Sequence, residues 1–152
     1  MPKVAVVIGS DSDRPAMQGC LEYLEKFGIE HELKVLSAHR QPEETSAFAR
    51  SAAAHGYQVV IAAAGMAAHL PGVIASHTTL PVIGVPLSAS ELRGEDALFS
   101  IVQMPAGIPV ATMGIGSTGA KNAAVMAAEI IALGNERIRQ TLGDFRKHGS
   151  RF

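Results

Sequence analysis

The sequence predicts an α/β fold in which a parallel β-sheet of about five strands lies between two layers of helices. Two observations predict it. Short apolar runs rich in valine and isoleucine alternate along the chain with segments of helical periodicity. Most of these runs are apolar throughout, which is typical of parallel strands covered on both faces. At 152 residues the chain fits one domain, expected to span residues 1–152.

The strands are expected where the apolar runs lie. Four runs are continuous enough to predict buried strands, at residues 4–8, 59–64, 81–85 and 110–115. Residues 31–36 alternate more between apolar and polar side chains, so we expect this strand nearer an edge of the sheet. Right-handed crossovers then favour a three-layer, doubly wound parallel sheet of flavodoxin-like or Rossmann-like type.

Helices are expected between the strands. The first is predicted by apolar residues spaced i, i+3, i+4 and i+7, with Pro15 near its start and Gly28 at its end: Met17, Cys20, Leu21 and Leu24. Cys20 is expected in the core and not as a nucleophile. The next helices are predicted at residues 42–55 before Gly56, just after Pro71, at 96–103 and at 118–133 before Gly134.

An extra C-terminal helix is predicted at residues 135–148, with Ile138, Leu142 and Phe145 on one stripe. Once helices cover both faces of a five-stranded sheet, this helix has little left to cover. We therefore expect it to pack on a neighbouring subunit.

Composition limits the possible partners. The formal net charge of −1 gives no electrostatic signal for nucleic acid, and no basic amphipathic segment points to a membrane surface. One cysteine excludes an intrachain disulfide, and neither a leader peptide nor a long apolar span is apparent, so we expect a cytoplasmic protein. Hydrophobic residues reach 47%, many of them alanine, which indicates tight packing and contacts between subunits.

The leading candidate site is Ser37-Ala38-His39-Arg40, between the expected strand 31–36 and helix 42–55. Ligands of open α/β sheets bind where strands end. His39 is able to carry a proton near neutral pH, and Arg40 to bind a phosphate or carboxylate. The open alternative is a solvated or structural histidine. The pair predicts acid–base chemistry on an anionic small molecule.

Two other segments follow expected strands. In Gly9-Ser10-Asp11-Ser12-Asp13, serine hydroxyls and backbone N–H groups suit an anion, and Asp13 suits sugar hydroxyls. The alternative is that Ser12 or Asp13 only caps the next helix. Residues 63–72 carry almost no bulky polar group before His69, so a ligand can approach the backbone in a dry pocket. The alternative there is a tightly packed connection.

The sequence gives no indication of a metal or cofactor. It lacks the dinucleotide fingerprint, the phosphate-binding P-loop and the Gly-x-Ser-x-Gly nucleophile elbow. Its six histidines and Cys20 do not fall at metal-ligand spacings. We therefore expect no metal, NAD or ATP.

Several segments together resemble the N5-carboxyaminoimidazole ribonucleotide mutases of purine biosynthesis. They are Gly9-Ser10-Asp11-Ser12-Asp13, Ser37-Ala38-His39-Arg40, Ala67-Ala68-His69-Leu70-Pro71-Gly72 and Ser100-Ile101-Val102-Gln103-Met104-Pro105, with Lys121-Asn122-Ala123-Ala124 on the last long sheet-packed helix. Their order and spacing fit over nearly the whole chain. The match is specific because each short segment is modest evidence and all occur in sequence.

The resemblance implies a cofactor-free and metal-free isomerase. It would move a carboxylate from the exocyclic nitrogen of an aminoimidazole ribonucleotide to ring carbon C4, through enclosed CO2. By similarity His39 is the proton shuttle and His69 the second catalytic histidine. The implied substrate-binding residues are Ser10, Ser12, Asp13, Ser37, Arg40, Gly65, Met66, Ala67 and Leu70. The resemblance also implies a homo-octamer with active sites at subunit contacts.

Three positions depart from that family. Ala63 and Met66 stand where glycines are usual, and Arg14 stands where tryptophan is common. If a replaced glycine required a positive φ, methionine would cost about 1 kcal/mol or more and shift the loop. Arg14 is expected either to contact phosphate or to be solvated. Two alternatives stay open: an aminoimidazole ribonucleotide carboxylase that takes free CO2, and a non-catalytic flavodoxin-like nucleotide-binding module.

Overall fold

The computed structural model describes all 152 residues and confirms the predicted α/β class. Its sheet has five parallel strands in the order β2-β1-β3-β4-β5. The strands are β1 Lys3–Ile8, β2 Glu30–Val35, β3 Val59–Gly65, β4 Val82–Leu87 and β5 Ala111–Thr112. β2 lies at one edge, as its alternating pattern predicts. The order is the flavodoxin-like one, in which the chain changes direction between β1 and β3.

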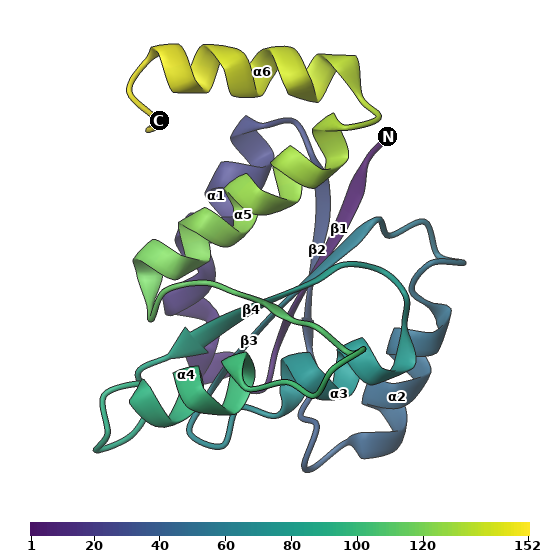
Figure 1. The fold of residues 1–152 in the computed structure, drawn as a ribbon, viewed down its shortest axis with the longest axis vertical. Coiled ribbons are helices and arrows are strands. Elements are labelled where there is room, and N and C mark those ends of the chain that lie inside the picture. The colour runs from purple at the N-terminus through teal and green to yellow at the C-terminus, as the bar shows by residue number, and fades with distance from the viewer.

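Helices cover both faces of the sheet (Figure 1). On one face lie α1 (Arg14–Lys26), which follows the 3-10 turn Asp11–Asp13, and α5 (Ser117–Ala132). The other face carries α2 (Pro42–Ser51), α3 (Leu70–His77) and α4 (Glu95–Val102). The last helix, α6 (Glu136–Lys147), packs against α5 at the end of the molecule where the chain begins.

Strand β1 divides the core between the two faces. Val4, Val6 and Ile8 belong to the cluster formed with α1 and α5, whereas Ala5 and Val7 belong to the cluster formed with α2 and α3. All five side chains are fully buried, which explains why the run is continuously apolar. The structure therefore confirms a central strand here.

Cys20 lies in the core beside α5, as predicted, and is fully buried. Burial raises the pKa of its thiol to about 12. The thiol therefore stays protonated at neutral pH and is not a nucleophile.

The last strand differs from its prediction. An apolar run at 110–115 predicts a buried strand, but β5 contains only two residues, of which Ala111 is exposed. Pro86 of β4 gives a physical reason. Its carbonyl accepts from the Gly116 N–H, on the side of the sheet where β5 lies. In a strand the nitrogen and the carbonyl of one residue point to the same side, so the Pro86 nitrogen also faces the β5 side, and proline has no N–H to donate there. The ladder therefore stops early, and β5 remains a short edge strand.

The C-terminal helix also differs from its prediction. The apolar stripe of α6 is buried within this chain and needs no neighbouring subunit to cover it. Its residues Ile138, Leu142 and Phe145 belong to the cluster formed with α1 and α5. The Phe145 ring lies 5.1 Å from that of Phe27 and 4.8 Å from that of Phe152. The helix therefore closes the core at this end, where the aromatic rings pack on one another.

Helix α2 is shorter than predicted. It ends at Ser51, and turns continue to Gly56, whose φ of +85° ends the segment as the sequence indicates. Its first residue, Pro42, lies where predicted, since proline suits the first turn of a helix.

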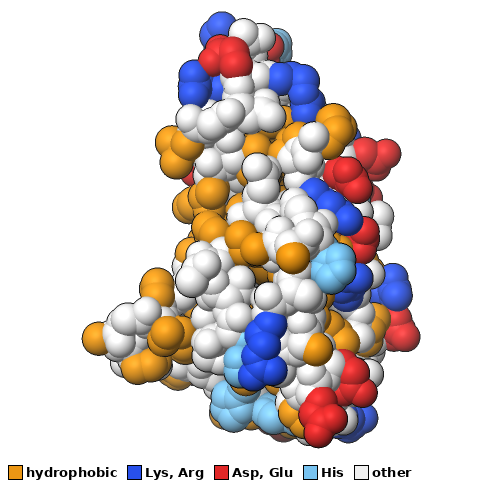
Figure 2. All heavy atoms as spheres, turned by 90° about the vertical axis from the view of Figure 1, so that its right-hand side faces the viewer, with side chains coloured by type: hydrophobic (Ala, Val, Ile, Leu, Met, Phe, Trp, Pro, Cys, Tyr) orange, Lys and Arg blue, Asp and Glu red, His pale blue; other side chains and the backbone are white.

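The surface carries mixed charge. Figure 2 shows acidic and basic side chains interspersed on one face, with hydrophobic side chains gathered along one flank. The structure has seven ion pairs, most of them exposed, so no strongly basic or acidic field forms from the near-neutral composition. No helix combines the length and the apolarity needed to cross a bilayer.

Candidate active site

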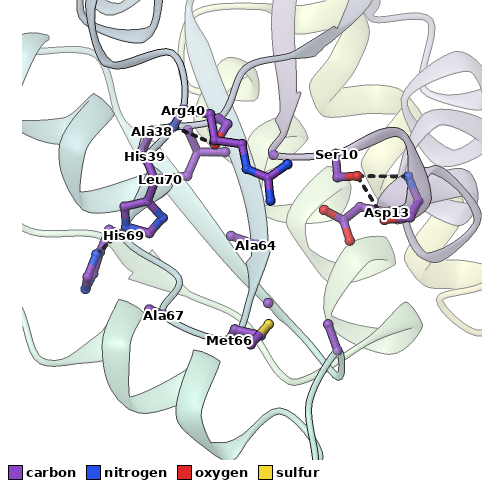
Figure 3. A pocket seen from close by; sticks show the side chains of 15 residues that line it. Ser10, Asp13, Ala38, His39, Arg40, Ala64, Met66, Ala67, His69 and Leu70 are labelled. Carbon is purple, nitrogen blue, oxygen red and sulfur yellow. Dashed lines mark hydrogen bonds between the residues drawn. The ribbon is translucent and has the colours of Figure 1, made fainter.

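A pocket of about 540 Å³ opens at the carboxyl ends of the first three strands (Figure 3). This is the point where the strand order reverses, which is the usual ligand site of such sheets. All eleven residues singled out from the sequence line it: Ser10, Ser12, Asp13, Ser37, His39, Arg40, Gly65, Met66, Ala67, His69 and Leu70. Three loops that are far apart in the sequence thus form one concave surface.

The loop after β1 presents hydroxyl groups and one carboxyl group. Ser10 Oγ lies 3.0 Å from Ser12 Oγ and accepts from the Ser12 N–H at 3.4 Å, so Ser10 is the residue that caps the short 3-10 turn. Asp13 begins α1 without a side-chain capping bond. Its carboxyl group is therefore available to the pocket, which the capping alternative did not predict.

Burial raises the pKa of Asp13 above its ordinary value, and a hydrogen bond with the Ser10 backbone opposes part of that rise. Asp13 is the only acidic side chain that lines the pocket. A partly buried carboxylate favours partners that donate hydrogen bonds, such as sugar hydroxyls.

The loop after β2 is held by its own hydrogen bonds. Ser37 Oγ accepts from the Arg40 N–H at 3.1 Å, and the Ser37 carbonyl accepts from the Gln41 N–H at 2.8 Å. Thr45, the only buried polar residue of the chain, donates to the Gln41 carbonyl at 2.8 Å. The backbone under His39 is thus fixed before any ligand binds, which preorganises the site.

Arg40 makes no ion pair with any carboxylate of the chain. In Figure 3 its guanidinium extends into the cavity on the side facing Ser10 and Asp13. An unpaired guanidinium beside hydroxyl groups suits a phosphate or carboxylate of a ligand.

The two histidines of the pocket touch one another. His39 Nε2 lies 2.7 Å from His69 Nδ1, and the rings meet edge to face, with centroids 4.9 Å apart and planes at 80°. A hydrogen bond between two imidazole nitrogens places one proton between them, because one nitrogen must donate and the other accept. The pair is therefore able to take up, hold and return a proton at the cavity wall (Figure 3).

The loop after β3 approaches the cavity with small residues. A Cβ atom at Gly65, the last residue of β3, would lie 2.5 Å from Ala89 Cβ, so only glycine permits this contact with the loop after β4. Ala67 follows without a bulky side chain. This wall is therefore formed largely by backbone and methyl groups.

The three positions that depart from the family pattern differ in backbone conformation and in surroundings. Met66 has φ +54°, so this replaced glycine does stand where the left-handed region is required, and its side chain is 59% exposed. Ala63 is buried with no positive φ. Arg14 pairs with Asp11 at 2.6 Å on the surface and does not line the pocket. The strain expected of the departures falls on Met66 alone.

Four lining residues are not among these eleven: Gly9, Ala38 and Ala64 lie inside segments that the sequence analysis named, and Ala89 lies in none of them. They bear no functional group, so no chemical pattern marks them. Their positions at the ends of β1 to β4 are the one available signal, and Ala89 in particular follows β4 by two residues. No group of three or more metal-ligating side chains gathers in the structure.

Comparison with known proteins gives consistent matches. The family model described as AIR carboxylase matches residues 3–151. The N5-carboxyaminoimidazole ribonucleotide mutase of Pyrococcus abyssi is 52% identical over 147 residues, which covers 97% of this chain and 83% of that protein. The enzyme of the same name from Escherichia coli strain K12 is 52% identical over 145 residues, 95% of this chain and 86% of that one.

Solved structures give the same fold. The crystal structure of Treponema denticola PurE matches with a TM-score of 0.89 at 26% identity, covering 99% of this chain and 92% of that one. A 3-dehydroquinate dehydratase-like protein from Bifidobacterium longum, at 20% identity and a TM-score of 0.57, is similar in fold alone.

Proposed function

Because the chain belongs to the AIR carboxylase family and acts as an N5-carboxyaminoimidazole ribonucleotide mutase in de novo purine biosynthesis, we propose that His39 and His69 move the proton of this reaction. The observation that carries the proposal is the 2.7 Å contact between the two imidazoles at the wall of the pocket. Residues 1–152 form the catalytic domain in this proposal.

The reaction balances with a single travelling proton. When the carbamate C–N bond breaks, its electron pair stays on the exocyclic nitrogen, which takes a proton and leaves CO2 and aminoimidazole ribonucleotide. Carbon C4 then attacks CO2, and the product forms when C4 loses its own proton to a base. His39 gives the first proton and recovers the second, and His69 holds it through their hydrogen bond. No net proton is consumed.

The remaining polar groups hold the ribonucleotide. Arg40 and the hydroxyls of Ser10, Ser12 and Ser37 suit its phosphate, and Asp13 suits ribose hydroxyls. This assignment fits the charged groups of the cavity, which are the unpaired guanidinium of Arg40 and the partly buried carboxyl group of Asp13. The imidazole ring then lies toward the histidines.

The small-residue wall encloses CO2. Gly65, Met66, Ala67 and Leu70 lie beside His69 and present backbone, methyl and thioether groups to the cavity. CO2 carries no net charge, so it needs no charged side chain to hold it. The exclusion of water prevents its hydration before C4 attacks.

The active assembly in this proposal is a cytoplasmic homo-octamer with active sites at subunit contacts, as the family resemblance implies. Three large hydrophobic side chains of α4 and the loop before it support contacts between subunits: Leu92, Phe99 and Val102 are 62%, 62% and 46% exposed. Figure 2 shows that hydrophobic groups gather along one flank and are not scattered evenly.

The proposal is tested with His39→Asn. Turnover of N5-carboxyaminoimidazole ribonucleotide should fall by about 10²–10⁴, because the proton carrier is lost, while ribonucleotide affinity measured by calorimetry stays close to that of the wild type. His148→Asn, on the far side of the molecule, is the matched control and should retain full turnover. Unchanged turnover in His39→Asn would overturn the proton assignment.

The choice between mutase and carboxylase is tested by substrate. Wild-type protein should form the C4 carboxylate from N5-carboxyaminoimidazole ribonucleotide and not from aminoimidazole ribonucleotide with low bicarbonate. Efficient turnover of the second mixture would contradict mutase activity.

A further inference from the structure

The loop after β4 forms a part of the pocket wall that has no assigned role. Residues 88–94 join β4 to α4, and Ala89 of this loop lines the ribonucleotide pocket against Gly65. A second hollow of about 720 Å³ lies outside the loop and shares Met66 and Ala89 with the pocket. Residues of this loop therefore line both the pocket and that hollow.

A single side chain of the following helix holds this loop. Ser90 Oγ donates to Asp96 Oδ2 at 2.8 Å and accepts from the Leu92 N–H at 3.0 Å. No other side-chain hydrogen bond involves residues 88–92. The loop then turns sharply into α4 through two residues with positive φ, Arg93 at +56° and Gly94 at +91°.

The burial of Asp96 has a cost in stability. Its second oxygen, Oδ1, is buried and has no hydrogen-bond partner, which is a destabilising arrangement. The carboxyl group lies in the first turn of α4, where the helix dipole favours a negative charge. What the side chain does achieve is the bond to Ser90, and through it the placement of Ala89.

We propose that Asp96 is a positioning residue for the mutase reaction: through Ser90 it keeps Ala89 against Gly65, so that CO2 stays in the pocket until C4 attacks it. The inference rests on the proposed function. When the loop is released, the C–N bond still breaks and the nitrogen still takes its proton. The CO2 then escapes into the second hollow and to water, and aminoimidazole ribonucleotide is released uncarboxylated.

Retention of the carboxyl carbon measures this escape directly. The substrate is labelled with ¹³C in its carbamate and supplied to the enzyme in unlabelled bicarbonate, with correction for decarboxylation without enzyme. Each turnover ends in labelled C4 carboxylate, in free aminoimidazole ribonucleotide, or, when CO2 exchanges with the solution before C4 attacks, in unlabelled C4 carboxylate. In Ser90→Ala the ratio of free aminoimidazole to labelled product should rise about tenfold, the effect of losing one hydrogen bond to a charged group.

Conservative variants and a matched control make the test specific. Ser90→Thr keeps the hydroxyl and should restore the wild-type ratio, and Asp96→Ala should behave like Ser90→Ala. Ser100→Ala removes another hydroxyl of the same region, which donates to the Asp96 backbone carbonyl at 2.6 Å and does not touch its carboxyl group. This variant should retain the label as the wild type does.

Two results would overturn the inference: a wild-type ratio in both Ser90→Ala and Asp96→Ala, or an equal loss of label in Ser100→Ala. Asp96→Asn preserves shape and one acceptor oxygen, so a partial loss is expected even if Asp96→Ala fails to fold. Wild-type protein that forms no C4 carboxylate would instead overturn the proposed function itself.

Discussion

The two ends of the sheet are built differently. At the end where the strands begin, α6 closes the core with the rings of Phe27, Phe145 and Phe152, whose centroids lie 4.8–5.1 Å apart. At the end where the strands finish, Gly65 and the small residues around it leave a cavity of about 540 Å³. Large apolar side chains stabilise one end, and the other end keeps its polar groups available to a ligand.

The difference indicates that stability and chemistry depend on separate residues. The aromatic rings gain free energy from burial and edge-to-face packing, neither of which touches the pocket. The polar groups of the pocket bond mainly within their own loops, apart from the contact between His39 and His69. Substitutions at the two ends should therefore change different measurements.

The largest effect is expected at the open end. In the proposed reaction His69 holds the proton of His39, so in His69→Asn turnover should fall by about 10²-fold or more, with little change in melting temperature. Turnover is followed by the absorbance of the C4 carboxylate, and melting by circular dichroism. A fall in melting temperature as large as the one expected for Phe145→Ala would contradict the separation of the two ends.

The next effect is expected at the closed end. Phe145→Ala should lower the free energy of unfolding by about 3–5 kcal/mol, because it leaves a cavity among the rings. The melting temperature should fall by about 10 °C. Urea unfolding measures the loss, and Phe145→Leu is the milder control. Turnover per folded molecule, assayed well below the transition, should match the wild type; a large deficit there would link the two ends energetically.

Met66 should be the exception at the open end. Its φ of +54° is unfavourable for a residue with a Cβ, so Met66→Gly should raise the free energy of unfolding by about 1 kcal/mol. Met66→Ala keeps the Cβ and should bring no such gain. Denaturant titration of the three proteins checks this. Equal stability of the glycine and alanine variants would mean that no strain is stored in the pocket loop.

The smallest effect concerns the outer strand β2. Hydrogen bonds from Lys3, Tyr57 and Lys34 lower the pKa of Glu32 to about 2. Because the folded pKa lies below the ordinary value of 4.5, the stability that this carboxylate contributes is present above pH 4.5 and is lost as the pH falls towards 2. Glu32→Gln should flatten the decline of melting temperature over that interval. An unchanged pH profile would show that Glu32 does not contribute to the loss of stability in acid.

Much of the site could be predicted because Ser10, His39 and His69 each follow an apolar run, and parallel strands finish at one edge. The bond between His39 and His69 could not be predicted. Their loops follow β2 and β3, which lie on either side of β1, so the two loops must reach across the end of β1 to meet. That approach depends on strand order and loop backbone, which residue patterns do not specify.

The fold, like the site, could be predicted where the sequence pattern is local. Apolar runs locate β1, β3 and β4, which are buried on both faces. The length of β5 depends instead on the side to which the Pro86 nitrogen points, and the burial of α6 depends on how its Phe145 ring packs on Phe27. Both are properties of three-dimensional packing.

The short strand β5 has a consequence for how copies of this chain meet. Exposed sheet edges invite another chain to add a strand, and natural proteins prevent this with short or charged edge strands. Here one edge is only two residues long, and the other carries Glu30, Glu32 and Lys34. Neither edge offers a template for a continuous intermolecular sheet. In the proposed oligomer, subunits would therefore join through helices and loops, the same elements that surround the pocket.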